Sequence, residues 1–154
     1  MIQQILIPTD FSDVAQRAVE YGCQLATRLG ARVTLLHAFS PGIVALPDAV
    51  FAATDAELRL LEEAAQHHLR AIAVESQRAG LQIECVAVEG VAAETVTSYA
   101  RQRQFDLIVM GTHGRRGLTH ALLGSVAERV LRAAPCPVLT VGRTAIQPMQ
   151  EAAL

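Results

Sequence analysis

The sequence contains no lysine, and its thirteen basic residues are all arginine. Schiff-base catalysis is therefore excluded, as is the lysine-containing phosphate loop of P-loop ATPases. The formal net charge is only −2 and the chain has no run of basic residues. Affinity for nucleic acid requires a concentrated positive face, so we expect no nucleic-acid partner.

Long hydrophobic runs are also missing, and none approaches the ~20 residues that span a bilayer. The opening MIQQILIPTDFS lacks the basic stretch and cleavage site of a secretory signal. We therefore expect a soluble, cytoplasmic protein without a membrane partner. Cysteine is scarce: Cys23, Cys85 and Cys136 are widely spaced among apolar neighbours. This pattern favours buried, reduced thiols over a disulfide framework or a metal or redox site.

What the sequence does contain is a regular alternation of strand and helix patterns within 154 residues, of which 51% are hydrophobic. That length and composition suit a single domain with a full core, which we place at residues 1–143, followed by a tail at 144–154. The segment 40–54 has two prolines and no period, and we predict a loop there. Strands are predicted at 2–8, 31–39, 81–90, 105–111 and 137–141, and helices at 10–30, 55–79, 92–104 and 125–134.

This alternation predicts an α/β fold: an open five-stranded parallel sheet with helices on both faces. Ligands of such sheets bind beyond the carboxyl ends of the strands, where the winding direction reverses. In the strand order 3-2-1-4-5 the reversal lies between the first and fourth strands. Pro8, Thr9 and Asp10 follow the first of these, and a glycine-rich stretch follows the fourth. We predict that both features face one crevice.

The glycine-rich stretch MGTHGRRGLTHALLGS spans residues 110–125 and has the form Gly111-x2-Gly114-x9-Gly124-Ser125. Gly111 and Gly114 can adopt positive φ and leave room for phosphate oxygens beside the backbone. Gly124 and Ser125 open the last predicted helix, whose free N–H groups and dipole favour an anion. Ser125 and Glu128 also form an S-x-x-E capping box, so a helix cap is the alternative role for this serine.

Over essentially its whole length the chain resembles the single-domain universal stress proteins. The resemblance is carried by ILIPTDFS, VTLLHAF, DLIVMGTHGRRGL, GSVAERVL and CPVLTV. It implies a Rossmann-like fold of the adenine nucleotide alpha-hydrolase type. Members of the family with the pattern G-x2-G-x9-G-[S/T] bind ATP, and this chain carries the complete pattern. The implied function is an ATP-binding regulatory protein of the stress response, with Mg²⁺ accompanying the nucleotide.

The resemblance also implies roles for individual residues. Asp10 would accept hydrogen bonds from the ribose hydroxyls, or else cap the first helix. Ala38 would meet the adenine edge through its backbone, or else belong only to the core. The implied nucleotide-binding set is Pro8, Thr9, Asp10, Ala38, Met110, Gly111, Gly114, Arg115, Arg116, Gly124, Ser125 and Val126. The two arginines are the natural partners of phosphate charge, and solvated loop arginines are the equally weighted alternative.

Other polar residues are assigned simpler roles. His37 lies in a predicted buried strand and is interpreted as a satisfied core histidine. His113 and His120 lack an oriented partner and are taken as surface or hydrogen-bonding residues. Asp106 is expected to bond local backbone rather than magnesium. No catalytic residue and no protein-built metal site are predicted.

Two further classes of function are weighed against ATP binding. An ATP pyrophosphatase needs a glycine-rich loop after the first strand, where this chain reads PTDFS, and no base is evidently placed for hydrolysis. We therefore expect a slow ATPase at most. A structural dimer that never binds nucleotide is the third interpretation. The apolar edge strand 137–141 predicts a homodimer, unless the tail from Thr144 covers it.

Overall fold

The structure is a computed structural model that describes residues 1–40, 44–46, 49–51, 53–78, 80–112 and 124–142. Every predicted strand and helix is present, with ends within a few residues of the predicted ones. The elements are β1 (Gln4–Pro8), α1 (Asp13–Leu29), β2 (Arg32–Phe39), β3 (Val44–Leu46), β4 (Ala49–Phe51), α2 (Asp55–Arg78), β5 (Ile83–Glu89), α3 (Ala92–Gln102), β6 (Leu107–Gly111), α4 (Ser125–Ala133) and β7 (Val138–Val141). The predicted tail at 144–154 lies outside the described residues.

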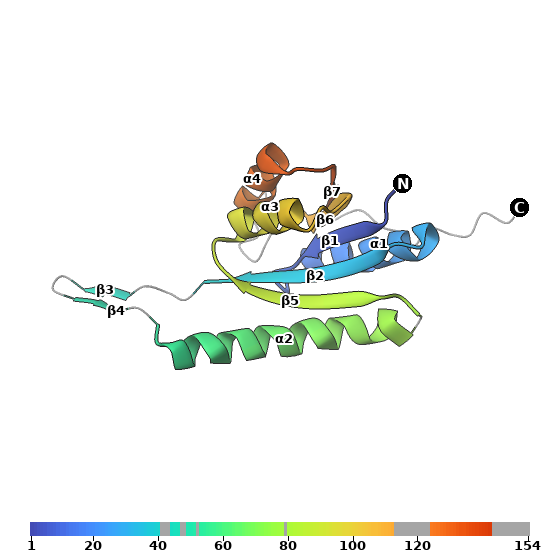
Figure 1. Cartoon of the computed structure of the whole chain (residues 1–154). Coiled ribbons are helices and arrows are strands. Elements are labelled where there is room, and N and C mark those ends of the chain that lie inside the picture. The colour runs from blue at the N-terminus through green and yellow to red at the C-terminus, as the bar shows by residue number, and fades with distance from the viewer. Residues whose placement is uncertain (41–43, 47–48, 52, 79, 113–123, 143–154) are drawn as a thin grey trace, which may run out of the picture.

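The prediction of a loop at 40–54 is wrong in part. β3 and β4 pair there as an antiparallel two-stranded sheet, separate from the main one. Strands of three residues are too short for a period to be visible in the sequence. In Figure 1 this hairpin and the first turns of α2 project beyond the carboxyl ends of β2 and β5.

The main sheet is parallel and has the order β5-β2-β1-β6-β7 (Figure 1). Since β5 is its third strand along the chain, this is the predicted order 3-2-1-4-5. β1 lies at the centre, and its middle residues are fully buried, as the apolar run at the N-terminus predicts. The switch in winding therefore falls between β1 and β6.

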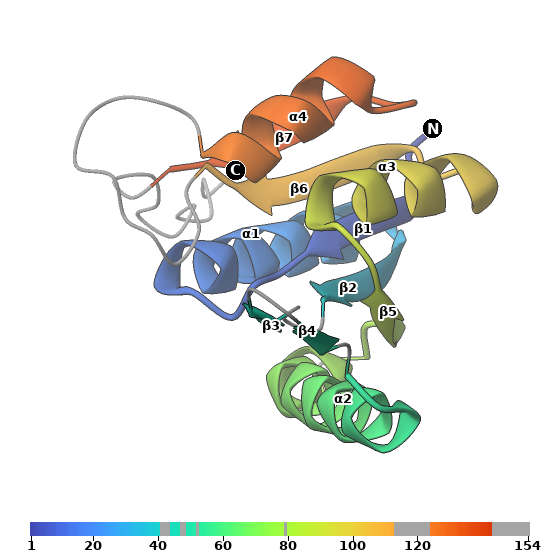
Figure 2. The same cartoon turned by 90° about the vertical axis from the view of Figure 1, so that its left-hand side faces the viewer.

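Two hydrophobic cores lie on the two faces of the sheet. Successive side chains of a strand point to opposite faces, so Ile5 and Ile7 pack with α1 and α2, and Leu6 packs with α3 and α4. Figure 2 shows this arrangement, with α2 and α4 on opposite sides of the sheet. Helices α1, α3 and α4 begin at the carboxyl edge, because each follows the end of a parallel strand, whereas α2 follows the hairpin of β3 and β4.

Helix α1 begins and ends as its sequence predicts. Ser12 is the N-cap, and its hydroxyl accepts a hydrogen bond from the N–H of Ala15 at 3.3 Å. Gly30 ends the helix in the left-handed conformation, with φ of 66°. Both termini are therefore determined by local sequence.

The buried side chains of α2 begin at Ala65. Leu69 and Ala73 are buried against β2 and β5, whereas Leu60 is 65% exposed and Leu61 43% exposed. The helix therefore covers the sheet only where the sheet extends beneath it. No helix in the described ranges is long and apolar enough to cross a membrane.

Asp106 joins β6 to β1 at the amino edge of the sheet. Its Oδ2 accepts hydrogen bonds from the N–H groups of Gln3 at 2.8 Å and Gln4 at 3.0 Å, which hold the pKa of the carboxyl below its ordinary value. The prediction that it bonds backbone is confirmed, but that backbone is more than 100 residues away in sequence rather than local. The residue lies at the edge opposite the expected ligand site.

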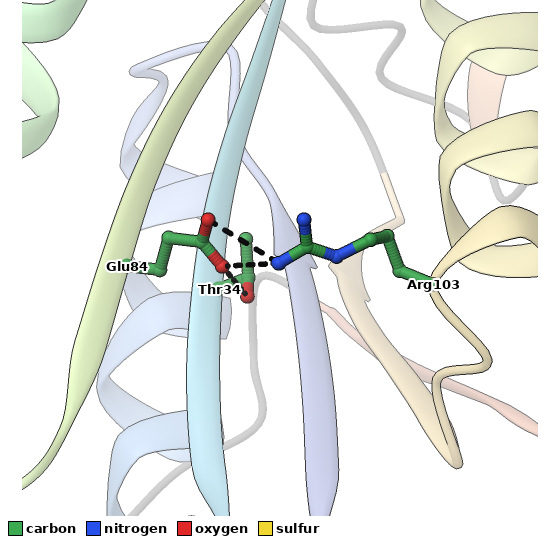
Figure 3. Close-up of polar contacts among 3 residues, drawn as sticks. All are labelled: Thr34, Glu84 and Arg103. Atoms are coloured by element: carbon green, nitrogen blue, oxygen red, sulfur yellow. Dashed lines mark hydrogen bonds and ion pairs between the residues drawn. The ribbon is translucent and has the colours of Figure 1, made fainter.

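A second polar contact lies on the α3 face of the sheet, near the amino ends of β2 and β5 (Figure 3). Glu84 of β5 accepts a hydrogen bond from the Thr34 hydroxyl at 3.3 Å and pairs with Arg103, after α3, at 3.2 Å. Both charged side chains are about half exposed, so the ion pair stabilises the fold by no more than about 1 kcal/mol. It holds the end of α3 against the outer strand.

The three cysteines are free thiols in the structure. Cys23 is buried, as predicted, and burial raises the pKa of its thiol. Cys85 and Cys136 are only partly buried, which corrects the prediction for these two.

Candidate functional site

The carboxyl edge of the sheet brings the two predicted features onto adjacent strands. β1 pairs with β6 in the register Ile5 to Leu107 and Leu6 to Ile108. The ladder between β1 and β2 continues one residue past β1, because the N–H of Thr9 donates to the carbonyl of Leu36 at 2.9 Å. The segment that follows β1 therefore leaves the sheet between the ends of β2 and β6.

Asp10 is held by the first turn of α1 but does not cap the helix. Its Oδ1 accepts hydrogen bonds from the N–H of Ser12 at 3.1 Å and from the Ser12 hydroxyl at 2.6 Å. The alternative role of helix cap is therefore wrong, since Ser12 occupies that position. These two contacts orient the carboxylate at the carboxyl edge of the sheet.

Phe11 adopts a backbone conformation that is rare for a bulky residue. Its φ is 64°, and its N–H donates to the Thr9 hydroxyl at 3.1 Å. The Phe11 ring lies 4.4 Å from the ring of His37 and 5.3 Å from that of His68, measured between centroids. The turn between β1 and α1 is thus packed against β2 and α2.

His37 takes part in this turn rather than in the core. It is half-buried, and its Nδ1 lies 2.8 Å from the carbonyl oxygen of Thr9. The interpretation as a core histidine is therefore corrected. The signal that points to it in the sequence is a polar side chain at the carboxyl end of an apolar strand, directly before Ala38.

The two described ends of the glycine-rich stretch meet at β6. The N–H of Gly124 donates to the carbonyl of Thr112 at 2.7 Å, and the N–H of Thr112 donates to Val141 at 2.9 Å. The N-terminus of α4 is therefore fixed beside the end of β6, at the same edge as Asp10. The motif residues Gly114, Arg115 and Arg116, with His113 and His120, lie outside the described residues.

The predicted capping box at the start of α4 is wrong. Gly124 is the N-cap, with φ of −61° and ψ of 149°, and no side chain in the described part of the chain caps this helix. The cap lies one residue earlier than expected, so Ser125 is already helical, and the N–H of Glu128 donates to the carbonyl of Gly124. The Glu128 carboxylate instead pairs with Arg132 at 2.7 Å. As far as the described residues go, the N-terminus of α4 thus presents its backbone N–H groups without a capping side chain.

Gly111 serves close packing within the protein. A Cβ on this residue would lie 3.0 Å from Val14 Cγ1 and 3.2 Å from the backbone carbon and oxygen of Val14. Its φ is not positive; among the described glycines only Gly30, Gly80 and Gly90 have positive φ. Gly111 therefore does not use the positive φ that a glycine permits. The glycine is needed because β6 ends against the first turn of α1.

The remaining predicted nucleotide-binding residues differ in how far they are buried. Met110 is buried and packs with Ala38 in the core under α3 and α4, so only the backbone of either residue faces the edge. Pro8 is half-buried and Thr9 is buried. Val126, in the first turn of α4, is 38% exposed.

A depression of about 490 Å³ lies at the opposite, amino edge of the sheet. It is lined mainly by small and polar residues around the end of α1 and the start of β2, including Gly30, Arg32 and Gly80. It contains none of the predicted site residues. Among the residues that the structure describes, no group of three or more histidine, cysteine or acidic side chains is placed to hold a metal ion.

Comparison with known proteins agrees with this fold. The sequence profile of the universal stress protein family matches residues 1–142. The chain belongs to the universal stress protein family. It is 39% identical to universal stress protein MJ0531 of Methanocaldococcus jannaschii, over 92% of this chain and 82% of the relative. It is 30% identical to universal stress protein MJ0577 of the same organism, over 93% and 96%.

Solved structures of the family superpose on this fold. The structure of MJ0577 has a TM-score of 0.74 at 29% identity and covers 95% of this chain and 99% of its own. A universal stress protein in complex with cAMP has a TM-score of 0.69 at 27% identity and covers 90% and 96%. At least one relative of similar architecture thus holds an adenine nucleotide.

Proposed function

We propose that this protein is an ATP-binding regulatory member of its family, with the nucleotide held between the ends of β1 and β6. The observation that carries the proposal is the N-terminus of α4. Among the described residues no side chain caps it, and it is fixed to Thr112 beside the turn that carries Asp10. Free N–H groups and the positive end of a helix dipole favour phosphate.

Each part of the nucleotide has a matching group at this edge. The backbone N–H groups of Ser125 and Val126 would bind phosphate oxygens, together with Gly114, Arg115 and Arg116. Asp10 would accept hydrogen bonds from the ribose, beside Pro8 and Thr9. The backbone of Ala38 would meet the adenine edge, and that of Met110 and Gly111 would lie beneath the phosphates. The cAMP complex of a relative supports the choice of an adenine nucleotide.

Magnesium fits this site as a companion of the phosphates. Mg²⁺ keeps several waters and binds through one or two carboxylates and the phosphate oxygens of its substrate. A protein cage is therefore unnecessary, which agrees with the lack of a three-ligand cluster in the described ranges. When bound, the ion would neutralise part of the phosphate charge. The chain has no lysine, so its own groups for this purpose are arginine side chains and backbone N–H groups.

Protein purified without added nucleotide is expected to carry an adenine nucleotide. Native mass spectrometry would show a mass increment that disappears after denaturation, and liquid chromatography would identify the released compound. Calorimetric titration of the stripped protein with ATP and Mg²⁺ should then give saturable binding at one site per chain. A stripped, folded protein that shows no heat of binding and no protection from thermal unfolding would favour the structural dimer instead.

Hydrolysis of the bound ATP is expected to be slow. Turnover should stay below about 0.1 s⁻¹, against the ~10 s⁻¹ typical of dedicated enzymes, because the described residues place no evident base to orient a water at the γ-phosphate. Release of phosphate from ATP at saturating concentration measures this rate. A rate of ordinary enzymatic size that is lost on replacement of Gly124 would contradict the proposal and make the protein an ATPase.

We further propose that the protein acts as a cytoplasmic homodimer joined through β7. β7 is the last strand in the order of the sheet, so its outer edge has no partner strand in the described part of the chain. An apolar edge strand is stabilised when a second copy pairs with it across a two-fold axis. Three free thiols suit the reducing cytoplasm.

A further inference from the structure

We infer that His37 is a positioning residue of the nucleotide site: its Nδ1–H holds the Thr9 carbonyl and thereby sets the orientation of Asp10. The inference rests on the proposed ATP site and adds a residue outside the motif. His37 lies on β2, one residue before Ala38, and its Nδ1 is 2.8 Å from the carbonyl oxygen of Thr9. Asp10 is the next residue along the chain from Thr9.

The chemistry of the partner determines the form of the imidazole. A backbone carbonyl oxygen only accepts hydrogen bonds, so the nitrogen that faces it must carry the proton. His37 is therefore the Nδ1–H tautomer when neutral. The imidazole of His37 is the hydrogen-bond donor in this contact. Another side chain that places an N–H group at the same distance from the backbone can replace it.

Packing holds the imidazole and the turn in one arrangement. The ring of Phe11 lies 4.4 Å from that of His37, tilted by 31°, and 5.3 Å from that of His68 of α2, measured between centroids. Phe11 occupies the left-handed region, with φ of 64°, a conformation that a bulky residue keeps only where its surroundings enforce it. The hydrogen bond from His37 and the aromatic contacts supply that enforcement.

Loss of the His37 donor would therefore act on the turn as a whole. The Thr9 carbonyl would lose its side-chain donor, and Phe11 would be released toward a less strained conformation. Asp10 lies between these two residues, so its carboxylate would spend only part of its time oriented toward the ribose. Apparent affinity falls in proportion to the fraction of molecules that are competent to bind.

Three variants separate this role from a purely structural one. His37→Leu removes the donor and is expected to raise the Kd for ATP about tenfold, as the loss of one such hydrogen bond implies. His37→Asn places an amide N–H at nearly the position of Nδ1 and should restore the Kd to within about threefold of wild type. His67→Leu changes an exposed histidine of α2 and should leave the Kd unchanged.

Nitrogen-15 NMR of the wild-type protein at about pH 8, where imidazoles are neutral, provides a readout independent of nucleotide. His37 should show a protonated Nδ1 and an unprotonated Nε2. The opposite tautomer would overturn the inference, as would equal ATP affinities of wild type and His37→Leu, or failure of His37→Asn to restore binding in a folded protein. A wild type that binds no ATP but shows the Nδ1–H tautomer would instead refute the proposed function.

Discussion

Replacing both Gly114 and Gly124 with valine is expected to weaken ATP binding at least about 100-fold and to leave the unfolding temperature nearly unchanged. Two added side chains would occupy the space of phosphate oxygens and separate them from the backbone N–H groups at the start of α4. Each lost hydrogen bond to a charged phosphate weakens binding by about 1.5–3 kcal/mol, so two such losses exceed 100-fold. Isothermal titration calorimetry measures the change.

The backbone at Gly124 makes this variant a clean test. Its φ of −61° and ψ of 149° lie in the extended region, which valine adopts without strain. Gly111 is unsuitable, because a Cβ there would press on the backbone of Val14 and destabilise the fold itself. Ala133→Val, at the exposed end of α4, adds similar bulk away from the site and should bind ATP normally. Unchanged affinity in the glycine double variant would refute the assignment of the loop.

Thr140→Pro is expected to convert the proposed dimer into a monomer without unfolding the protein. The N–H groups of Ile108 and Thr112 donate to the carbonyls of Pro137 and Val141. In a parallel ladder alternate residues bond the same neighbour, so Thr140 turns its N–H away from β6, toward the outer edge. Proline removes that donor and is tolerated on an edge strand. Light scattering should show the mass fall from twice 16.5 kDa to 16.5 kDa.

Thr140→Val is the matched control, because it keeps the outward N–H and should keep the dimer. Aspartate at Val141 is less informative, since this side chain is 4% exposed and its replacement would unfold the core. A wild type that is already monomeric would contradict pairing through β7, as would a Thr140→Pro variant that keeps the dimer mass. Either result would direct attention to residues 144–154 as the cover of this edge.

The order of the elements and the place of the site could be predicted from the sequence alone. Apolar runs and helical periods are local properties, so the alternation of strands and helices is visible in one dimension. Ser12 and Gly30 terminate α1 as predicted because capping depends on residues within one turn. The adjacency of β1 and β6 followed from the predicted strand order, which placed Asp10 and the glycine motif at one edge.

Other features depended on contacts between residues distant in sequence. Gly111 is required by the approach of Val14 from α1, and Asp106 bonds the backbone at Gln3 and Gln4, about 100 residues away. The start of α4 is set by the hydrogen bond between Gly124 and Thr112, which displaces the capping box that the local sequence favours.

His37 illustrates the same division between sequence and tertiary structure. Its position in a buried strand is evident from the sequence, but its partner is not, because Thr9 is 28 residues earlier in the chain. Backbone hydrogen bonds across a sheet, and the contacts of a turn with the neighbouring strand, arise only when the strands are in register. The sequence by itself therefore determined which elements form and which edge carries the site. Tertiary structure decided which atoms meet there, because those distances are set by packing between elements rather than within them.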